Sequence, residues 1–214
     1  MITGDSVTLE GSLGVPPSAS GIVLFAHGSG SSRHSPRNNY VARVLRRAGV
    51  ATLLMDLLTE EEDRDYEARF DIDLLTRRLV SATRWVGAQT TTRRLAVGYF
   101  GASTGAAAAL NAAARLGDAV GAVVSRGGRP DLADSLGRVT APTLLIVGGL
   151  DTEVIALNRL AFSQLRGKKE LTIVPGATHL FEEPGTLEQV AELAARWFTG
   201  HLSPLPPRTE PHAP

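Results

Sequence analysis

The chain of 214 residues contains no cysteine. It therefore has no disulfide, no metal site built from thiolates and no cysteine nucleophile. Lys plus Arg and Asp plus Glu both number 22, which gives a formal net charge of zero. Nothing in this balance favours nucleic acid or an anionic membrane as a partner. No apolar run is long enough to span a bilayer.

The first residues, 1–5, lack the basic region and apolar core of a secretory signal. We therefore expect a cytoplasmic protein that acts on a small molecule, and we leave a homodimer open. Hydrophobic residues make up 43% of the chain, which suits a globular domain. We expect one domain over residues 1–202, followed by a proline-rich tail over 203–214.

Short apolar runs, typical of strands buried on both faces, alternate with segments of helical periodicity. An α/β fold with a mostly parallel sheet and helices on both faces is therefore expected. Residues 7–13 alternate as one half-buried edge strand. A capping box of Thr186 and Gln189 begins the last helix. Further strands are expected at 21–26, 50–55, 95–100, 119–124, 142–147 and 171–174, and helices from Pro36 to near Gly49, over 72–87, 106–116, 131–136 and 154–165.

The sequence Gly101-Ala102-Ser103-Thr104-Gly105 follows an apolar run and precedes an alanine-rich segment. This strand-turn-helix context and the G-x-S-x-G pattern indicate a nucleophile elbow, in which the serine hydroxyl stands above the sheet. The two glycines remove Cβ atoms that would collide at the sharp turn. Ser103 is the predicted nucleophile, held in a strained backbone conformation at a helix N-terminus.

A serine hydroxyl needs a base, and the base needs an orienting carboxylate. His179 follows the last predicted strand, at the sheet edge where such folds place their sites. Asp151 follows the preceding strand at the same edge, and it also precedes a predicted helix as an N-cap. The order Ser103, Asp151, His179 is the one expected after this motif. Asp131 is the alternative acid.

A tetrahedral intermediate needs N–H donors for its oxyanion. One is expected from Thr104, the residue after the nucleophile, and the second from the glycine-rich loop that follows residues 21–26. We assign the second donor to Ser29, with Gly28 or Gly30 as alternatives. His27 is expected to brace this loop by a hydrogen bond rather than to act in catalysis.

The rim of the site is predicted from loops at the same edge. Gly28, Gly30, His34 and Arg126 are the candidate substrate-binding residues. Arg126, and to a lesser degree Arg33, would favour substrates with a carboxylate or other anionic group, because an arginine fork matches a carboxylate with two hydrogen bonds. Alternatively, these arginines pair with Asp56 or with the acidic run 60–63 and only pin the loops.

Together these residues resemble the α/β-hydrolase superfamily over 21–202. Two features are similar to bacterial members of the dienelactone-hydrolase-like group. One is the lack of room for a cap domain. The other is the segment His27-Gly28-Ser29-Gly30-Ser31-Ser32-Arg33-His34-Ser35-Pro36-Arg37-Asn38. The resemblance implies hydrolysis of esters or related acyl bonds without a cofactor. The dienelactone hydrolases themselves carry cysteine at the elbow, so Ser103 makes this chain more similar to carboxylesterases.

The sequence leaves two other functions open. A thioesterase or a perhydrolase-like acyl transfer could use the same Ser103, His179 and Asp151. A fold relative that binds without catalysis would keep the architecture but not a reactive serine. Fold analogy alone does not separate these functions.

Overall fold

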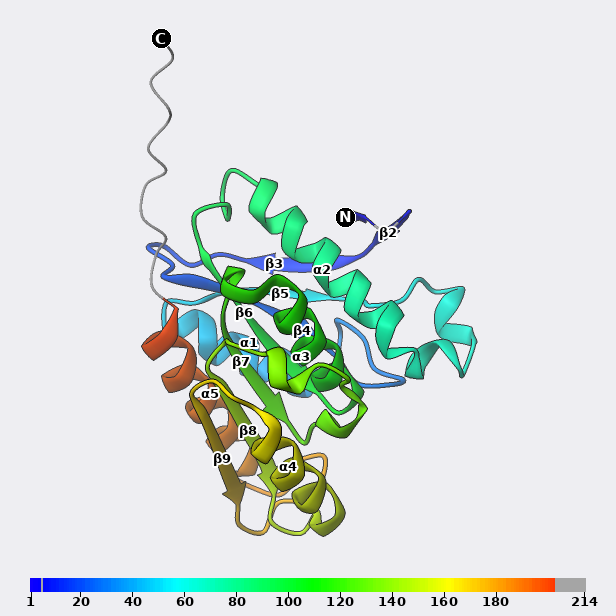
Figure 1. Cartoon of the computed structure of the whole chain (residues 1–214). Helices are drawn as coiled ribbons and strands as arrows, with labels where there is room; N and C mark the ends of the chain where they lie inside the picture. Colours follow the sequence, from blue (N-terminus) through cyan, green and yellow to red (C-terminus); the bar gives the residue numbers. More distant parts are fainter. Residues whose placement is uncertain (5, 203–214) are drawn as a thin grey trace.

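The computed structural model describes residues 1–4 and 6–202. Its centre is a seven-stranded sheet in the order β3-β5-β4-β6-β7-β8-β9 (Figure 1). β3 (Gly11–Gly14) runs antiparallel to its neighbour at one edge, and the other strands are parallel. This is the mostly parallel sheet that the sequence predicts. The parallel strands are β4 (Gly21–Ala26), β5 (Ala51–Met55), β6 (Ala96–Ala102), β7 (Val120–Arg126), β8 (Thr143–Gly148) and β9 (Lys169–Val174).

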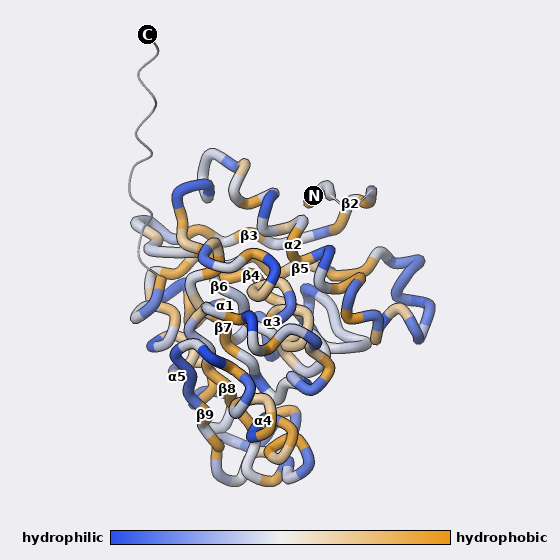
Figure 2. Tube along the Cα trace, in the orientation of Figure 1, coloured by the Kyte–Doolittle hydropathy of each residue, from blue (hydrophilic) through white to orange (hydrophobic). Residues whose placement is uncertain are grey.

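Helices cover both faces of the sheet. α1 (Pro36–Arg47) and α5 (Thr186–His201) pack on one face. α2 (Ile72–Ala88), α3 (Thr104–Leu116) and α4 (Thr152–Gln164) pack on the other. Each central strand therefore contributes to two cores, because successive side chains point to opposite faces. Figure 2 shows apolar residues along the central strands and hydrophilic ones in the outer loops.

The α1 helix begins as its sequence predicts. The Ser35 hydroxyl accepts a hydrogen bond from the Asn38 N–H at 3.3 Å, and Pro36 occupies the first helical position. This cap satisfies one of the N–H groups that a helix N-terminus leaves free. The helix ends at Arg47. Two residues later, Gly49 takes a φ of +80°, which residues with a side chain rarely adopt.

The N-terminal segment differs from the single strand that was expected. β1 (Ile2–Gly4) and β2 (Val7–Leu9) pair with each other as a separate two-stranded sheet, and only β3 joins the main sheet. Ser6, with φ +63°, lies in the turn that reverses the chain between β1 and β2. Side-chain alternation cannot report such a turn, because it continues on both sides of it.

Two other local expectations are corrected. Residues 131–136 form no continuous helix but lie across two 3₁₀ turns, Pro130–Leu132 and Leu136–Arg138. Thr186 is not the N-cap of α5, because Gly185 takes that position with φ +81° and the Thr186 hydroxyl donates to the Glu183 carbonyl at 2.7 Å. The predicted tail at 203–214 lies outside the described residues. In the part of the chain that the structure describes, no helix is both long and apolar enough to cross a membrane.

Candidate active site

Ser103 lies where β6 ends and α3 begins, and its backbone is strained. Its φ of +50° and ψ of −123° lie outside the regions that a non-glycine residue usually adopts. The neighbouring strand holds this conformation, since the Ser103 N–H donates to the Arg126 carbonyl at 3.3 Å and the Ser103 carbonyl accepts from the Arg129 N–H at 3.0 Å. The predicted strained turn is therefore present, and it is fixed from β7 and the loop that follows.

The two elbow glycines are required for different reasons. A Cβ on Gly101 would lie 2.4 Å from the Cα of Ala106, within the elbow itself. A Cβ on Gly105 would lie 2.2 Å from the Ala26 carbonyl oxygen, at the end of the adjacent strand β4. The sequence argument attributes both glycines to the turn alone. The structure shows that Gly105 instead permits the helix to approach the neighbouring strand.

His179 and Asp151 are brought together from neighbouring strand ends. The His179 Nδ1 atom lies 2.6 Å from the Asp151 Oδ2 atom. Asp151 occupies the N-cap position of α4 but makes no side-chain cap bond, so its carboxylate is committed to the histidine. The alternative acid, Asp131, forms an ion pair with Arg129 at 2.7 Å instead.

Ser103 and His179 line the same cavity of about 240 Å³. Asp151 lies behind the histidine with 15% of its side chain exposed. A carboxylate in this position accepts a hydrogen bond from Nδ1–H, which leaves Nε2 as the unprotonated ring nitrogen. The arrangement can support a nucleophilic serine with a histidine base.

The loop that carries His179 is fixed independently of the other candidate residues. The Thr178 hydroxyl and N–H both donate to the Glu183 carboxylate, at 2.6 and 3.1 Å. These bonds hold the pKa of the Glu183 carboxyl below its usual range. Phe181 is fully buried with φ +55°, a conformation that bulky residues rarely adopt. The histidine therefore sits on a loop that is anchored on both sides.

The two residues predicted to supply oxyanion donors, Ser29 and Thr104, contact each other. The Ser29 N–H donates to the Thr104 hydroxyl at 3.0 Å. Gly28 also approaches the nucleophile, because a Cβ built on it would lie 3.0 Å from the Ser103 Cβ. Gly28 and Ser29 both line the cavity that contains Ser103.

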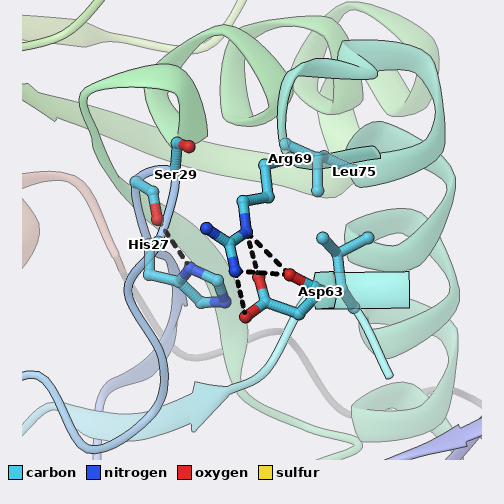
Figure 3. Close-up of a pocket in the computed structure, with 8 residues that line it drawn as sticks. His27, Ser29, Asp63, Arg69 and Leu75 are labelled. Carbon is cyan, nitrogen blue, oxygen red and sulfur yellow. Dashed lines mark hydrogen bonds and ion pairs between the residues drawn. The ribbon is translucent and has the colours of Figure 1, made fainter. Parts of the chain in front are cut away.

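His27 braces this loop from below, as its sequence position suggests. The Leu57 N–H donates to His27 Nε2 at 3.0 Å, so the ring proton lies on Nδ1, which donates to the Gly28 carbonyl at 3.0 Å. Burial lowers the pKa of His27 below 6.5, although its hydrogen bond to Gly28 and the charge of Asp56 act in the opposite direction. Figure 3 shows the His27 ring beside the paired Asp63 and Arg69 side chains.

We expect His27→Ala to destabilise the protein by about 1–3 kcal/mol, because the buried Leu57 N–H would lose its acceptor. The pH dependence follows from the depressed pKa. Below pH 6.5 the unfolded histidine binds a proton that the folded one resists, so stability is complete above that value and falls as the pH drops toward the folded pKa. Chemical denaturation from pH 8 to 5 measures this effect. The free energy of unfolding should fall less steeply toward low pH in the variant than in the wild-type protein. The control is His34→Ala, which removes an exposed histidine. This role would be contradicted if the free energy of unfolding fell with pH equally in His27→Ala, His34→Ala and the wild-type protein.

The remaining predicted rim residues lie elsewhere. His34 is exposed, and it does not line the cavity that contains Ser103. Gly30 lines a separate small void of about 10 Å³ beneath the loop. Arg33 pairs with Asp56 and Glu10, so it pins loops, as the alternative interpretation holds. Of the substrate-binding candidates, Gly28 and Arg126 line the cavity.

A solved structure decides the family. The chain has 59% identity to a dienelactone hydrolase from Anabaena variabilis, with a TM-score of 0.92 over 94% of this chain and 95% of that one. The chain belongs to the dienelactone-hydrolase-like group of the α/β-hydrolases. This is the superfamily that the elbow motif indicates.

A second solved structure has the same fold, and two curated relatives carry a different functional name. Est1E from Butyrivibrio proteoclasticus superposes with a TM-score of 0.79 at 17% identity, over 93% of this chain and 96% of that one. Two curated proteins from Mycobacterium tuberculosis strains, provisionally named phosphoribosyl transferase, are 63% identical over 202 residues. That match covers 94% of this chain but only 46% of theirs, so the chain spans about half the length of these relatives. No protein-family profile matches the chain.

Sequence reasoning missed part of the cavity that contains Ser103. Arg37, Asn38 and Leu180 line it alongside the predicted residues. Arg37 and Asn38 lie in the first turn of α1, where their helical position gave no sign of which side they face. Leu180 directly follows His179, and its place next to the candidate base could have been used as a signal.

Proposed function

We propose that this chain is a serine hydrolase that cleaves carboxylic esters, with Ser103 as nucleophile, His179 as base and Asp151 as the residue that orients the base. The observation that carries the proposal is the 2.6 Å contact between His179 Nδ1 and Asp151 Oδ2, beside a strained serine that lines the same cavity. A partly buried acid paired to the histidine is the arrangement that a catalytic histidine base needs.

In the proposed cycle the Ser103 hydroxyl oxygen attacks the ester carbonyl while its proton passes to His179 Nε2. The developing imidazolium is stabilised by Asp151 through Nδ1–H. The tetrahedral intermediate then collapses, the histidine returns the proton to the departing alcohol, and an acyl-serine remains. Water, activated by the same histidine, attacks this acyl group and releases the acid and the free serine.

The oxyanion is proposed to bind the Thr104 N–H and the Ser29 N–H. The Ser29 N–H now donates to the Thr104 hydroxyl, so it reaches the oxyanion either after that hydroxyl rotates or through the hydroxyl's own proton. Either route concentrates donors where negative charge develops.

The mycobacterial relatives carry a transferase name, and we propose that this name belongs to the part of those proteins outside the match. The support is that the matched part is 63% identical to this chain, and this chain is in turn 59% identical to a dienelactone hydrolase. Thioester hydrolysis on the same residues is the second candidate, favoured by the open serine site rather than by any particular contact.

A substrate panel with an active-site probe tests the proposal. We expect a fluorophosphonate probe to label Ser103, identified by peptide mass, and p-nitrophenyl esters of short acyl chains to be hydrolysed faster than matched thioesters and lactones. Faster turnover of thioesters would assign the second function. Absence of labelling, together with no turnover of any of the three classes, would contradict a hydrolase and favour a binding role.

A further inference from the structure

Arg126 is a buried cation with no acidic partner among the described residues. Its side chain lies at the end of β7 with 7% of the residue exposed. Among the described residues it forms no ion pair or side-chain hydrogen bond, and its Nε atom is buried with no partner. Its one side-chain interaction is with the Phe181 ring, whose centre lies 5.8 Å away. Burial, and then the nearby charge of Arg37, lower the pKa of Arg126 to about 10.

Such an arrangement is costly, because a buried charge normally needs a partner. Elsewhere the chain provides one, as in the ion pair of buried Arg78 with Glu62. Packing against Phe181 could be achieved by an uncharged side chain at lower cost. An unpaired guanidinium in the cavity that contains Ser103 therefore calls for a ligand that supplies the negative charge.

The cavity around Arg126 is suited to an anion. No acidic side chain is among the residues that line it, whereas two arginines and several serines are. The second arginine, Arg37, contacts exposed Glu182 at 2.8 Å through one terminal nitrogen, and its buried Nε atom has no partner. Arg37 lies in the first turn of α1, where the helix dipole adds positive potential.

We infer that the substrate of this hydrolase carries a compact anionic group, a phosphate or a carboxylate, that binds between Arg126 and Arg37 while its ester carbonyl lies at Ser103. This inference rests on the proposed function for the position of the carbonyl. The anion subsite itself rests on the burial and isolation of Arg126, which do not depend on the reaction. A guanidinium presents two parallel N–H groups that match either anion.

The test compares three esters that share one acyl chain and one leaving-group size and end in a phosphate, a carboxylate or a neutral carboxamide. For Arg126→Gln we expect the ratio of kcat/KM on an anionic ester to that on the neutral ester to fall about 10- to 100-fold, the scale of a lost charged hydrogen bond. The change should lie mainly in KM. The anion with the larger fall identifies the natural group.

The matched control is Arg43→Gln, an exposed arginine on the same helix as Arg37 that does not line the cavity. It removes the same charge and should preserve the ratio. Arg126→Lys keeps the charge but loses the fork, so it should fall between wild type and Arg126→Gln. This variant also keeps the test valid if Arg126→Gln does not fold. Equal losses on all three esters would overturn the inference and leave Arg126 as a packing residue.

A binding measurement separates this inference from the catalytic proposal. Inorganic phosphate and acetate are titrated by calorimetry into the folded Ser103→Ala protein, which cannot turn over an ester. We expect at least one anion to bind, and at least tenfold more weakly when Arg126→Gln is added. Binding without esterase activity in the wild-type protein would keep the subsite and reject the ester proposal. Esterase activity without Arg126-dependent anion binding would keep the ester proposal and reject the anion subsite.

Discussion

Ser103→Ala is expected to lower kcat on a p-nitrophenyl ester by about 10⁶-fold, the scale seen when a serine hydrolase loses its nucleophile. The chain contains no cysteine that could replace the serine. Residual hydrolysis of about 10³-fold over water should persist, because the oxyanion donors and the binding cavity remain. Initial rates with active-site titration of the wild-type protein measure the loss directly.

The control for this experiment is Ser163→Ala, which removes an exposed serine hydroxyl on α4. Both variants should unfold with the cooperativity of the wild-type protein, since the Ser103 backbone conformation is fixed by bonds from β7 and the following loop rather than by its hydroxyl. A Ser103→Ala protein with near wild-type turnover would reject the nucleophile assignment. A loss equal in both variants would point to general damage.

Asp151→Asn is expected to lower kcat by up to about 10⁴-fold, because an amide in place of the carboxylate favours the wrong histidine tautomer. The carboxylate now accepts from His179 Nδ1 at 2.6 Å. An amide N–H facing the same nitrogen would leave the proton on Nε2, where it blocks removal of the serine proton. The KM for a neutral ester should change little, since Asp151 does not line the cavity.

The structure offers a matched variant for this prediction in Asp131→Asn, the acid that sequence order left as the alternative. Asp131 pairs with Arg129 at 2.7 Å, and an exposed pair of this kind contributes about 0–1 kcal/mol to stability. Its replacement should therefore be mild in kcat. If Asp131→Asn is the damaging change and Asp151→Asn is mild, the orienting acid has been misassigned. Fluorophosphonate labelling rates should follow the same order.

The length of the mycobacterial relatives bears on how these experiments are designed. The chain matches 46% of each of those proteins. An activity measured on this chain therefore describes the matched part of such a protein. The same variants placed in a full-length relative would show whether the rest of that protein alters the ester preference.

Most of the fold was predictable from local patterns. Continuous apolar runs such as residues 21–26 predict buried parallel strands, because both faces of a doubly covered sheet are apolar. Ser35 as the N-cap and Pro36 as the first helical residue predict the residue at which α1 begins. Two of the failures are turns of unusual backbone, at Ser6 and at Gly185, where positive φ values break a pattern that side-chain chemistry continues. The third is the helix expected over 131–136, which is replaced by two 3₁₀ turns.

The candidate triad was also predictable, because strand order fixes where loops meet. Three parallel strands that end at one edge bring Ser103, Asp151 and His179 together whatever lies between them. What side chains do within that edge is a different matter. The sequence suggests two free N–H donors for an oxyanion, whereas the structure shows one of them bonded to the Thr104 hydroxyl.

By itself, then, the sequence determined the nucleophile elbow, the parallel sheet and the order of the candidate catalytic residues, since these depend on local spacing and on strand ends. Only the tertiary structure decided which arginine faces the cavity. The sequence favours Arg126 over Arg33 but leaves both arginines open as pocket residues or as residues that only pin loops. Asp56 and Glu10 form ion pairs with Arg33, whereas Arg126 forms none with any carboxylate in the part of the chain that the structure describes. That distinction comes from contacts between residues far apart in the chain, which local spacing cannot report.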